Sequence, residues 1–378
     1  MSKLLQQEQP GFFERWGIRY FEKLAKKLHL NQERYSPTDA ELVKSVRRIT
    51  WIAGFSSFGI GALSAGGSVL AEQLTIDRSI IEHYLWIGGV TLILTAIEFY
   101  ILFVIAIHTV FHISKVIGHQ RLDTRPDLLG GLIPNLLARA ALEIPDPVQR
   151  ILGIDPLAQV SKRKMMLIGL LYKVKVVFSN VLAKLLMKRL LAKSTVRVLA
   201  YWVSVPITGL WNAIVAFKVA REAKMRLFGY LLADHIATHQ LSDSQLNQLS
   251  PKAQLGCLQA VGNAVVLTQN YHPNMLILLV RVADALNVKE GTDFANWSTF
   301  LQTLAEVNQK ERNFLCDLLA VATAFDGHFS TLEKQKVPEA FGENTKIYVE
   351  RIEKLIRLLK SGRLNQAIDL CELDFNAG

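Results

Sequence analysis

Two long apolar segments joined by a short loop restrict what this chain can fold into. The first segment, residues 50–71, contains no charged side chain, and the second, residues 84–113, contains only Glu98. About 20 consecutive apolar residues are enough for a helix to cross the hydrocarbon core of a bilayer. The two segments therefore predict an all-α integral membrane protein with a transmembrane helical hairpin.

The basic surplus of the chain belongs to the part that contains these segments. Residues 1–240 contain 30 Lys and Arg against 17 Asp and Glu, whereas residues 241–378 contain 13 against 16. Arg47 and Arg48 precede the first segment, and Lys115 follows the second. The positive-inside rule then predicts an inner (cytoplasmic) membrane protein with cytoplasmic N- and C-termini and an outward-facing hairpin loop. The expected partners of the basic residues are the lipid bilayer and its anionic lipids, not nucleic acid.

Four regions are expected along the chain. They are amphipathic basic N-terminal helices at 1–49, the transmembrane hairpin at 50–118, a membrane-associated helical region at 119–240, and a cytoplasmic helical domain at 241–378.

The third region contains a further apolar run at residues 196–220. This run is uncharged apart from Arg197 and Lys218 and is interrupted by Pro206 and Gly209. It forms either a kinked third span or half of a re-entrant pair with residues 165–183.

The N-terminal region begins with an amphipathic segment at residues 11–30. Its apolar side chains recur at helical spacing, opposite a face that carries Lys23, Lys26 and Lys27. This pattern is typical of a helix lying in a membrane interface, and equally of a helix packed on the core of its own protein.

Small residues crowd the first apolar segment. Ser57 and Gly61 lie four residues apart, and Gly66 follows. Small side chains at this spacing allow a neighbouring helix backbone to approach closely. We therefore predict that this span packs tightly against a partner helix and that the protein forms a homo-oligomer through it.

The second apolar segment carries one polar stripe. On a helical wheel centred on Glu98, four other polar side chains fall on the same side: Thr91, Thr109, His108 and His112. A carboxylate at membrane depth normally faces protein or water. The stripe is either a proton or cation path, a metal site that uses both histidines, or a structural stripe that hydrogen-bonds the first span or a symmetry mate.

A basic stripe is predicted on residues 162–193. Lys173, Lys184 and Lys188 fall close together on the wheel of an otherwise apolar helix. The helix is interpreted as interfacial, as a span lining an anion pathway, or as part of a soluble core.

The C-terminal region has helix-start signals of a water-soluble domain. Ser242, Ser250 and Ser330 each begin a predicted helix, and Glu333 follows Ser330 at the spacing of a capping box. Between two of these helices, Gly327 permits a left-handed turn. The three cysteines lie in this region without metal-ligand spacing and are expected to be reduced thiols.

Residues 315–333, LCDLLAVATAFDGHFSTLE, resemble the helix–turn–helix signature of TerB-like, tellurite-resistance-type domains. In that family an apolar helix ends in Asp-Gly, and a Ser starts the next helix with a Glu three residues on. The matching residues here are Asp326, Gly327, Ser330 and Glu333.

The TerB-like resemblance covers residues 245–345 and implies a small all-helical module. It also implies a divalent-metal site, for which Asp326 and Glu333 occupy the matching positions. No other cofactor is expected.

Residues 205–232 resemble the EcsC family of helical membrane-associated domains, which implies membrane association. The residues that carry the likeness are Pro206, Gly209, Asn212, Ala213, Ala223 and Phe228.

No phosphate-binding loop, nucleophile elbow, HExxH or paired-carboxylate motif occurs in the sequence, and we expect no enzymatic activity. The predicted function is a membrane-anchored scaffold or sensor whose cytoplasmic TerB-like domain docks a protein partner, in an envelope or metal and tellurite stress response. The alternative is an oligomeric ion channel or transporter that uses the Glu98 stripe or the Lys173 helix.

Overall fold

The structure is a computed structural model of the 378-residue chain. It describes residues 37–117, 197–269, 272–286 and 294–373, together with residues 15–17, 19–20 and 23–24 near the N-terminus. Within these ranges the fold is all-helical and contains no strand, which confirms the predicted fold class at this level.

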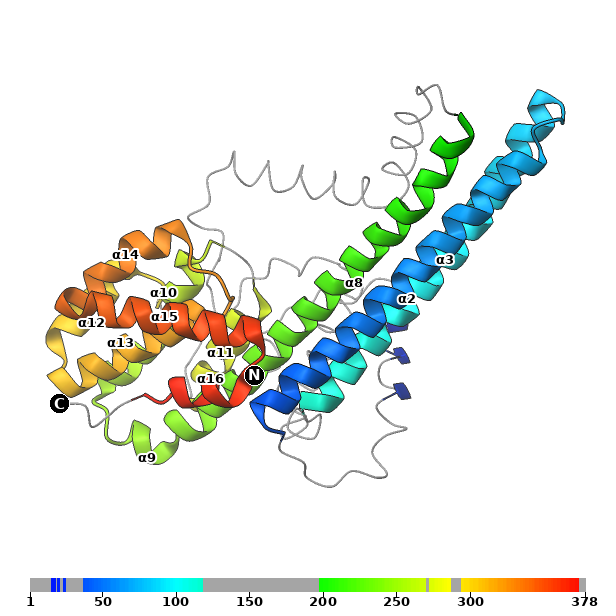
Figure 1. The fold of residues 1–378 in the computed structure, drawn as a ribbon. Helices are drawn as coiled ribbons and strands as arrows, with labels where there is room; N and C mark the ends of the chain where they lie inside the picture. Colours follow the sequence, from blue (N-terminus) through cyan, green and yellow to red (C-terminus); the bar gives the residue numbers. More distant parts are fainter. Residues whose placement is uncertain are drawn as a thin grey trace. The chain divides into compact units, whose positions relative to one another are not determined.

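The described helices are shown in Figure 1 and named by its labels. Their bounds are α2 Asp39–Leu74, α3 Ile80–Ile117, α8 Arg197–His235, a π-helical turn Ile236–Gln240, α9 Asp243–Leu246, α10 Pro251–Leu267, α11 Pro273–Ala285, α12 Trp297–Glu306, α13 Gln309–Ala324, α14 Thr331–Phe341, a 3-10 turn Gly342–Asn344, α15 Thr345–Ser361 and α16 Leu364–Leu370.

The chain forms two compact units. One, here called the three-helix unit, comprises Arg47–His112 and Ser161–Arg221. The other, the C-terminal unit, comprises Met1–Val46, Ile113–Val160 and Glu222–Gly378. Helices α2, α3 and α8 each have residues in both units.

The three-helix unit contains the two predicted spans. Helices α2 and α3 are long and apolar enough to cross a membrane, with mean hydropathy of 1.3 and 2.5 over their most apolar windows. They run antiparallel, because Gly67 lies against Leu94 and the turn between them is closed where His83 Nδ1 lies 2.8 Å from the Thr75 carbonyl oxygen.

Helix α8 packs against α2 in the antiparallel direction. Gly54 faces the ring of Phe217, and Gly209 faces the Phe58 carbonyl oxygen. The run predicted as a kinked span or half of a re-entrant pair is thus one continuous helix that passes through Pro206. Its predicted partner in the re-entrant interpretation, residues 165–183, lies outside the described residues.

The C-terminal unit is built around buried apolar faces of α8, α10, α13 and α15. Helices α10 and α13 are buried along nearly their whole length. The last turns of α8 join this core, since Phe228 and Leu232 are fully buried. The last of the three segments of this unit therefore begins within α8 at Glu222, whereas the sequence placed the start of the C-terminal domain at residue 241.

Local hydrogen bonds start the helices of this unit as the sequence predicted. Ser250 accepts from the backbone N–H of Ala253, and Ser330 and Glu333 form a reciprocal capping box. Ser242 precedes α9 but makes no side-chain cap. These caps satisfy backbone donors that have no partner within their own helix.

The start of α2 is fastened to the start of α16. Both carboxylate oxygens of Asp39 accept backbone N–H bonds, from Asn365 at 2.8 Å and from Gln366 at 3.1 Å. Because the first N–H groups of a helix have no partner within it, a carboxylate from elsewhere in the chain can cap it. Asp39 therefore joins two segments that are 326 residues apart.

The N-terminal amphipathic segment is described only in part. The described residues between 15 and 24 are helical, and the rings of Trp16 and Tyr20 stack with centroids 5.4 Å apart. The helical spacing expected for this segment is thus found where the structure describes it, and the lysines at positions 26 and 27 lie outside the described residues.

Candidate functional site

A buried polar cluster occupies the middle of the three-helix unit. Its centre is Gly61 on α2, where the absent side chain leaves room for α8. A Cβ placed at Gly61 would collide with Nδ2 of Asn212 and lie 2.9 Å from the Thr208 carbonyl oxygen. Glycine is therefore required here for the two helices to approach as closely as they do.

Asn212 links α8 to α3. Its side-chain amide donates a 2.7 Å hydrogen bond to Oε1 of Glu98, and both side chains are almost fully buried. An interhelical hydrogen bond of this kind is worth about 0.6–2 kcal/mol in a membrane. Gly61, Glu98 and Asn212 together hold all three helices at one level.

Further small polar side chains extend the cluster along α2. They are buried within the unit, and Ser68 Oγ donates to the Ser64 carbonyl oxygen at 3.0 Å. Among the described side chains of α2 and α8, the buried serines and threonines are Ser57, Ser64, Ser68 and Thr208.

The cluster lies near the middle of the apolar stretch of the unit. The uncharged part of α2, residues 49–71, is roughly 34 Å long at ~1.5 Å per residue, and Gly61 is near its centre. Cationic side chains gather at one end of the unit: Arg47, Arg48, Lys218 and Arg221 are all exposed there.

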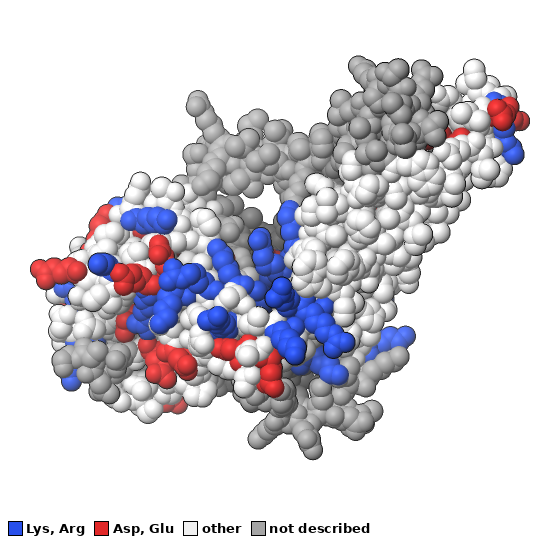
Figure 2. Space-filling view, viewed as in Figure 1, with Lys and Arg blue, Asp and Glu red and all other residues white. Residues whose placement is uncertain are grey.

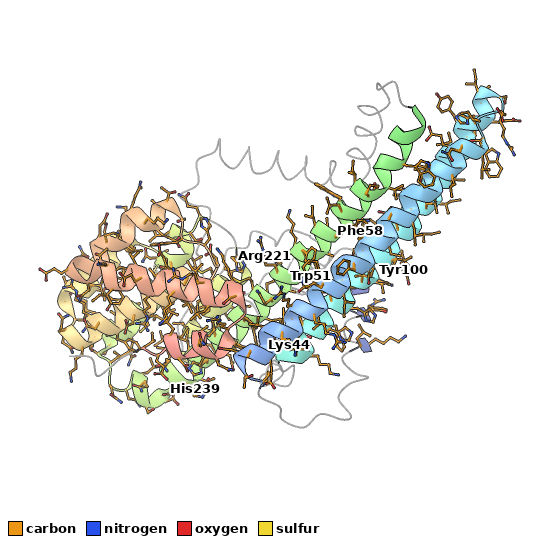
Figure 3. All side chains as sticks on the ribbon, in the orientation of Figure 1. Lys44, Trp51, Phe58, Tyr100, Arg221 and His239 are labelled. Carbon is orange, nitrogen blue, oxygen red and sulfur yellow. The ribbon has the colours of Figure 1, made fainter. Side chains whose placement is uncertain are left out.

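The outer surface of the unit is apolar. Figure 2 shows it almost free of charge along most of its length. Phe55 and Leu63 are 68% and 73% exposed, and Trp51, Phe58 and Tyr100 (labelled in Figure 3) are also on the surface. Among the described residues, all exposed large hydrophobic side chains except Leu255 and Ile347 belong to this unit or its hairpin turn.

The predicted small-residue contacts are found within one chain. Ser57 is buried and Gly61 contacts α8, whereas a Cβ placed at Gly66 would have only Val205 near it, at 4.0 Å. The face of α2 expected to pair with another copy is thus covered by α8 of the same chain. Homo-oligomerisation stays a prediction without a surface assigned to it.

The predicted polar stripe of α3 divides into buried and exposed members. Glu98 and Thr109 are buried, and Thr109 donates to its own helix at the Ile105 carbonyl oxygen. The hydroxyl of Thr91 is buried and has no hydrogen-bond partner among the residues that the structure describes. His112 is exposed, and the rings of His108 and His112 lie 6.1 Å apart.

The described residues do not assemble a metal site around these histidines. No group of three or more His, Cys, Asp or Glu side chains with metal-binding geometry occurs in the part of the chain that the structure describes. The basic stripe of Lys173, Lys184 and Lys188 lies outside the described residues.

In the C-terminal unit, the predicted Asp-Gly turn has the expected geometry. Gly327 adopts a left-handed φ of 74°, which follows the end of α13. Asp326 is buried and accepts from the hydroxyl of Thr268 at 2.6 Å and from the backbone N–H of His328 at 2.7 Å. Both of its oxygens are therefore occupied by the fold.

Glu333 is the more unusual carboxyl of this turn. It is fully buried, its Oε2 accepts from the Ser330 N–H at 2.6 Å, and its Oε1 has no hydrogen-bond partner. Burial, followed by the negative charge of Asp326, raises the pKa of Glu333 to about 8. The carboxyl is consequently protonated at neutral pH.

Asp326 and Glu333 do not fit a divalent-metal site by themselves. They are two carboxyls without a third His, Cys, Asp or Glu in suitable geometry among the described residues, whereas Ca²⁺ takes six to eight oxygen ligands. Their hydrogen bonds serve the turn and the start of α14.

The three cysteines are buried and unpaired. Burial raises the pKa of each thiol, Cys257, Cys316 and Cys371, to about 12. Thiols with such pKa values are unreactive at neutral pH, which agrees with the predicted reduced state.

Sequence reasoning from residue chemistry missed Asn212 as the partner of Glu98. Asn212 is among the residues quoted for the EcsC resemblance, which itself stays a prediction. Five of its six positions are buried on α8, namely Gly209, Asn212, Ala213, Ala223 and Phe228.

No protein family model, curated protein or solved structure matches this chain.

Proposed function

We propose that this protein is a membrane-anchored, non-enzymatic scaffold or sensor whose three-helix unit crosses the cytoplasmic membrane and whose C-terminal unit docks a protein partner in the cytoplasm. The observation that carries the proposal is the inverted distribution of polarity in the three-helix unit. Polar side chains such as Glu98 and Asn212 are buried in its interior, whereas many of its large apolar side chains, such as Phe55 and Leu63, are exposed.

The exposed apolar surface supports immersion in lipid. Phe55, Leu63 and Leu92 are each more than two-thirds exposed. Burying apolar surface stabilises a protein by roughly 25 cal/mol per Å², so leaving such side chains in water is costly. A lipid phase removes this cost for α2 and α3, the two helices long and apolar enough to span it.

A third crossing by α8 follows from its packing. Residues 198–217 carry no charge, and Asn212 lies at the level of Gly61, near the middle of the α2 run. If α2 spans the membrane, then this part of α8 lies at the same depth. We therefore propose α8 as a third spanning helix, which the hydropathy of its sequence alone does not single out.

The charge distribution supports an orientation. Four exposed cations lie at one end of the unit, whereas the hairpin turn at the other end carries Asp77, Arg78 and Glu82. The cationic end is placed in the cytoplasm by the positive-inside rule. The hairpin turn and Arg197 at the start of α8 then face outward, and the C-terminal unit is cytoplasmic.

The proposed docking role depends on the connection between the spanning helices and the C-terminal unit. Helix α8 continues without a break from its uncharged run into the buried core of the C-terminal unit, and Asp39 on α2 caps α16. Ile347, 66% exposed at the start of α15, is one of two large apolar side chains exposed among the described residues of this unit. It is the anchor we assign to a partner.

An ion pathway is the second candidate, since Glu98 is a carboxyl near the middle of the apolar stretch. Its hydrogen bond to Asn212 gives it a structural role instead. Flux measured in liposomes distinguishes the two, because a pathway through Glu98 would be abolished by Glu98→Gln.

Alkaline carbonate extraction of membranes tests the anchor. We expect the full chain to remain in the membrane pellet and to require detergent for release. Recovery in the aqueous fraction would refute the proposal.

A photo-crosslinking residue in place of Ile347 tests docking in cells. We expect a discrete adduct with a cytoplasmic protein, competed by overexpressed wild-type chain. The same residue placed at Gln335, also exposed but polar, is the control. Equal adducts at both positions, or none at Ile347, would remove the docking assignment.

A further inference from the structure

A cluster of exposed cations lies around the end of α15 in the C-terminal unit. Lys354, Arg357, Lys360 and Arg363 follow one another at intervals of three residues and are all exposed. Residues three apart are neighbours on a helix surface. Figure 2 shows Lys and Arg side chains gathered on this face, with acidic side chains beside them.

The turn after α15 brings further cations to the cluster. Gly362 adopts a left-handed φ of 88° and closes the helix, as its N–H and that of Arg363 both bond to the Leu358 carbonyl oxygen. Lys224 of α8 donates to the Lys360 carbonyl oxygen. A positive charge at this carbonyl is favourable because helix C-termini are negative.

The first residues of α2 lie at the same turn. A Cβ placed at Gly362 would be 3.6 Å from Cδ of Lys224 and 3.7 Å from Cγ2 of Val43. The exposed Lys44 follows Val43 directly. Three separate segments of the C-terminal unit therefore contribute to one basic cluster, defined as Lys44, Lys224, Lys354, Arg357, Lys360 and Arg363.

Four exposed cations of the cluster have no acidic partner among the described residues. Arg357 lies 3.8 Å from Glu353 in an exposed pair, and Lys44, Lys354, Lys360 and Arg363 form no ion pair within the described ranges. Other lysines of the unit do find partners, such as Lys252 with Glu306 and Lys336 with Glu339. Residues 241–378 are acidic in total, so the cluster is a local concentration of charge.

The position of Lys44 relates the cluster to the membrane. It precedes Arg48 by one helical turn, or about 6 Å of rise, and the uncharged run of α2 begins at Ile49. If this run spans the bilayer, as the proposed function holds, then Lys44 lies at headgroup depth. Cations in that layer gain about 1 kcal/mol each from anionic lipid.

We propose that the basic cluster binds anionic phospholipid headgroups of the cytoplasmic leaflet. This inference rests on the proposed function and deepens it, because it names the surface by which the C-terminal unit meets the membrane. Lysine and arginine stems suit the role: Cε of Lys360 lies 3.9 Å from the Cβ position of Gly327, and the residue as a whole is exposed.

Hydrogen exchange of the full chain in nanodiscs tests the inference. We compare discs of phosphatidylcholine with discs that also contain phosphatidylglycerol. We expect amides of residues 354–366 to exchange at least about fivefold more slowly with the anionic lipid, since ~1 kcal/mol from a single cation already gives this factor. High salt should abolish the difference.

Two charge variants serve as matched controls. Replacing Lys354, Arg357, Lys360 and Arg363 by Gln should remove the lipid dependence. Replacing Lys252, Lys310, Lys334 and Lys336 by Gln removes the same charge elsewhere and should preserve it. Melting temperatures of both variants, compared with the wild type in phosphatidylcholine discs, show whether each is folded.

Three outcomes would overturn the inference. Exchange of residues 354–366 that is the same in both lipids would do so, as would equal loss in the two charge variants. Protection by inorganic phosphate in phosphatidylcholine discs would assign the cluster to a soluble phosphate instead. Residues 50–71 provide the separate check: if they are unprotected in both lipids, the membrane crossing itself is wrong, and this inference falls with it.

Discussion

The two compact units differ most clearly in the side chains that they expose. In the three-helix unit Glu98 and Asn212 are 3% and 2% exposed, while Leu63 on the surface is 73% exposed. In the C-terminal unit Phe228 and Phe314 are buried, and the lysines and arginines near the end of α15 are outside. One unit has the polarity expected in lipid, and the other has the polarity expected in water.

The difference also changes what holds each unit together. In water, burial of apolar area is the main stabilising term, which suits the close apolar packing of α10 against α13, where Gly256 lies against Leu315. In lipid this term is lost between helices, and close packing with interhelical hydrogen bonds replaces it. If the three-helix unit crosses the membrane as proposed, Gly61 and the Glu98–Asn212 bond supply this second kind of stabilisation.

The largest effect is predicted for Gly61→Leu. The new side chain would meet Asn212 and the Thr208 carbonyl oxygen, so α8 must move away from α2. Overpacking of this kind costs about 3 kcal/mol. We expect aggregation or a strongly lowered melting temperature in detergent.

Gly59→Leu is the matched control, because a Cβ at Gly59 meets nothing within 4 Å. We expect its melting temperature to stay near that of the wild type. Equal damage from the two substitutions would mean that helix propensity, not α2–α8 packing, governs the result.

The pH dependence of the C-terminal unit should report Glu333. Its pKa is raised to about 8 from 4.5, so the folded state binds a proton that the unfolded chain releases. The stability contribution is present below the unfolded pKa of 4.5 and is lost as pH rises toward 8. Between pH 5 and 7 the loss should be roughly 2–3 kcal/mol, because each pH unit between the two pKa values is worth about 1.4 kcal/mol.

Glu333→Gln isolates this effect. Hydrogen exchange of α13 and α14 in the full chain should depend less on pH in the variant than in the wild type between these pH values. Identical pH profiles would show that Glu333 ionises normally in the folded protein.

A smaller effect is predicted at Asp39. Asp39→Ala removes the cap of α16 and should cost ~1 kcal/mol, which is typical of losing a helix cap. The expected observation is faster exchange at Asn365 and Gln366. Asp39→Asn retains one acceptor oxygen and should lose less. Unchanged hydrogen exchange at Asn365 and Gln366 in Asp39→Ala would contradict the contact between Asp39 and α16.

The smallest effect concerns the polar centre of the three-helix unit. A double-mutant cycle of Glu98→Leu and Asn212→Leu should give a coupling of about 0.6 kcal/mol, the average for interhelical hydrogen bonds measured by such cycles in a membrane protein. The measurement is reversible unfolding in detergent. A coupling near zero would leave α3 held only by apolar packing.

Local features of this fold were accessible from the sequence, and distant pairings were not. The uncharged runs located α2 and α3, and Ser330 with Glu333 predicted a capping box that the structure confirms. Such signals depend on residues within one or two helical turns of each other.

The sequence predicted Glu98 and Gly61 of the candidate site but not Asn212. The cost of a buried carboxylate singled out Glu98, and the small residues predicted a close neighbour for Gly61. That neighbour is α8. The same helix carries Asn212, the hydrogen-bond partner of Glu98, which lies 114 residues away along the chain. No periodic pattern connects residues that far apart, and the same holds for Asp39 and Asn365.

The most direct measurement of the central claim is labelling of single cysteines in intact cells with a membrane-impermeant maleimide. The native thiols are buried and give little background. We predict that Ser79→Cys in the hairpin turn and Arg197→Cys at the start of α8 are labelled from outside, whereas Ser361→Cys in the C-terminal unit is labelled only after permeabilisation. Labelling of all three in intact cells, or of Ser361→Cys alone, would contradict the account.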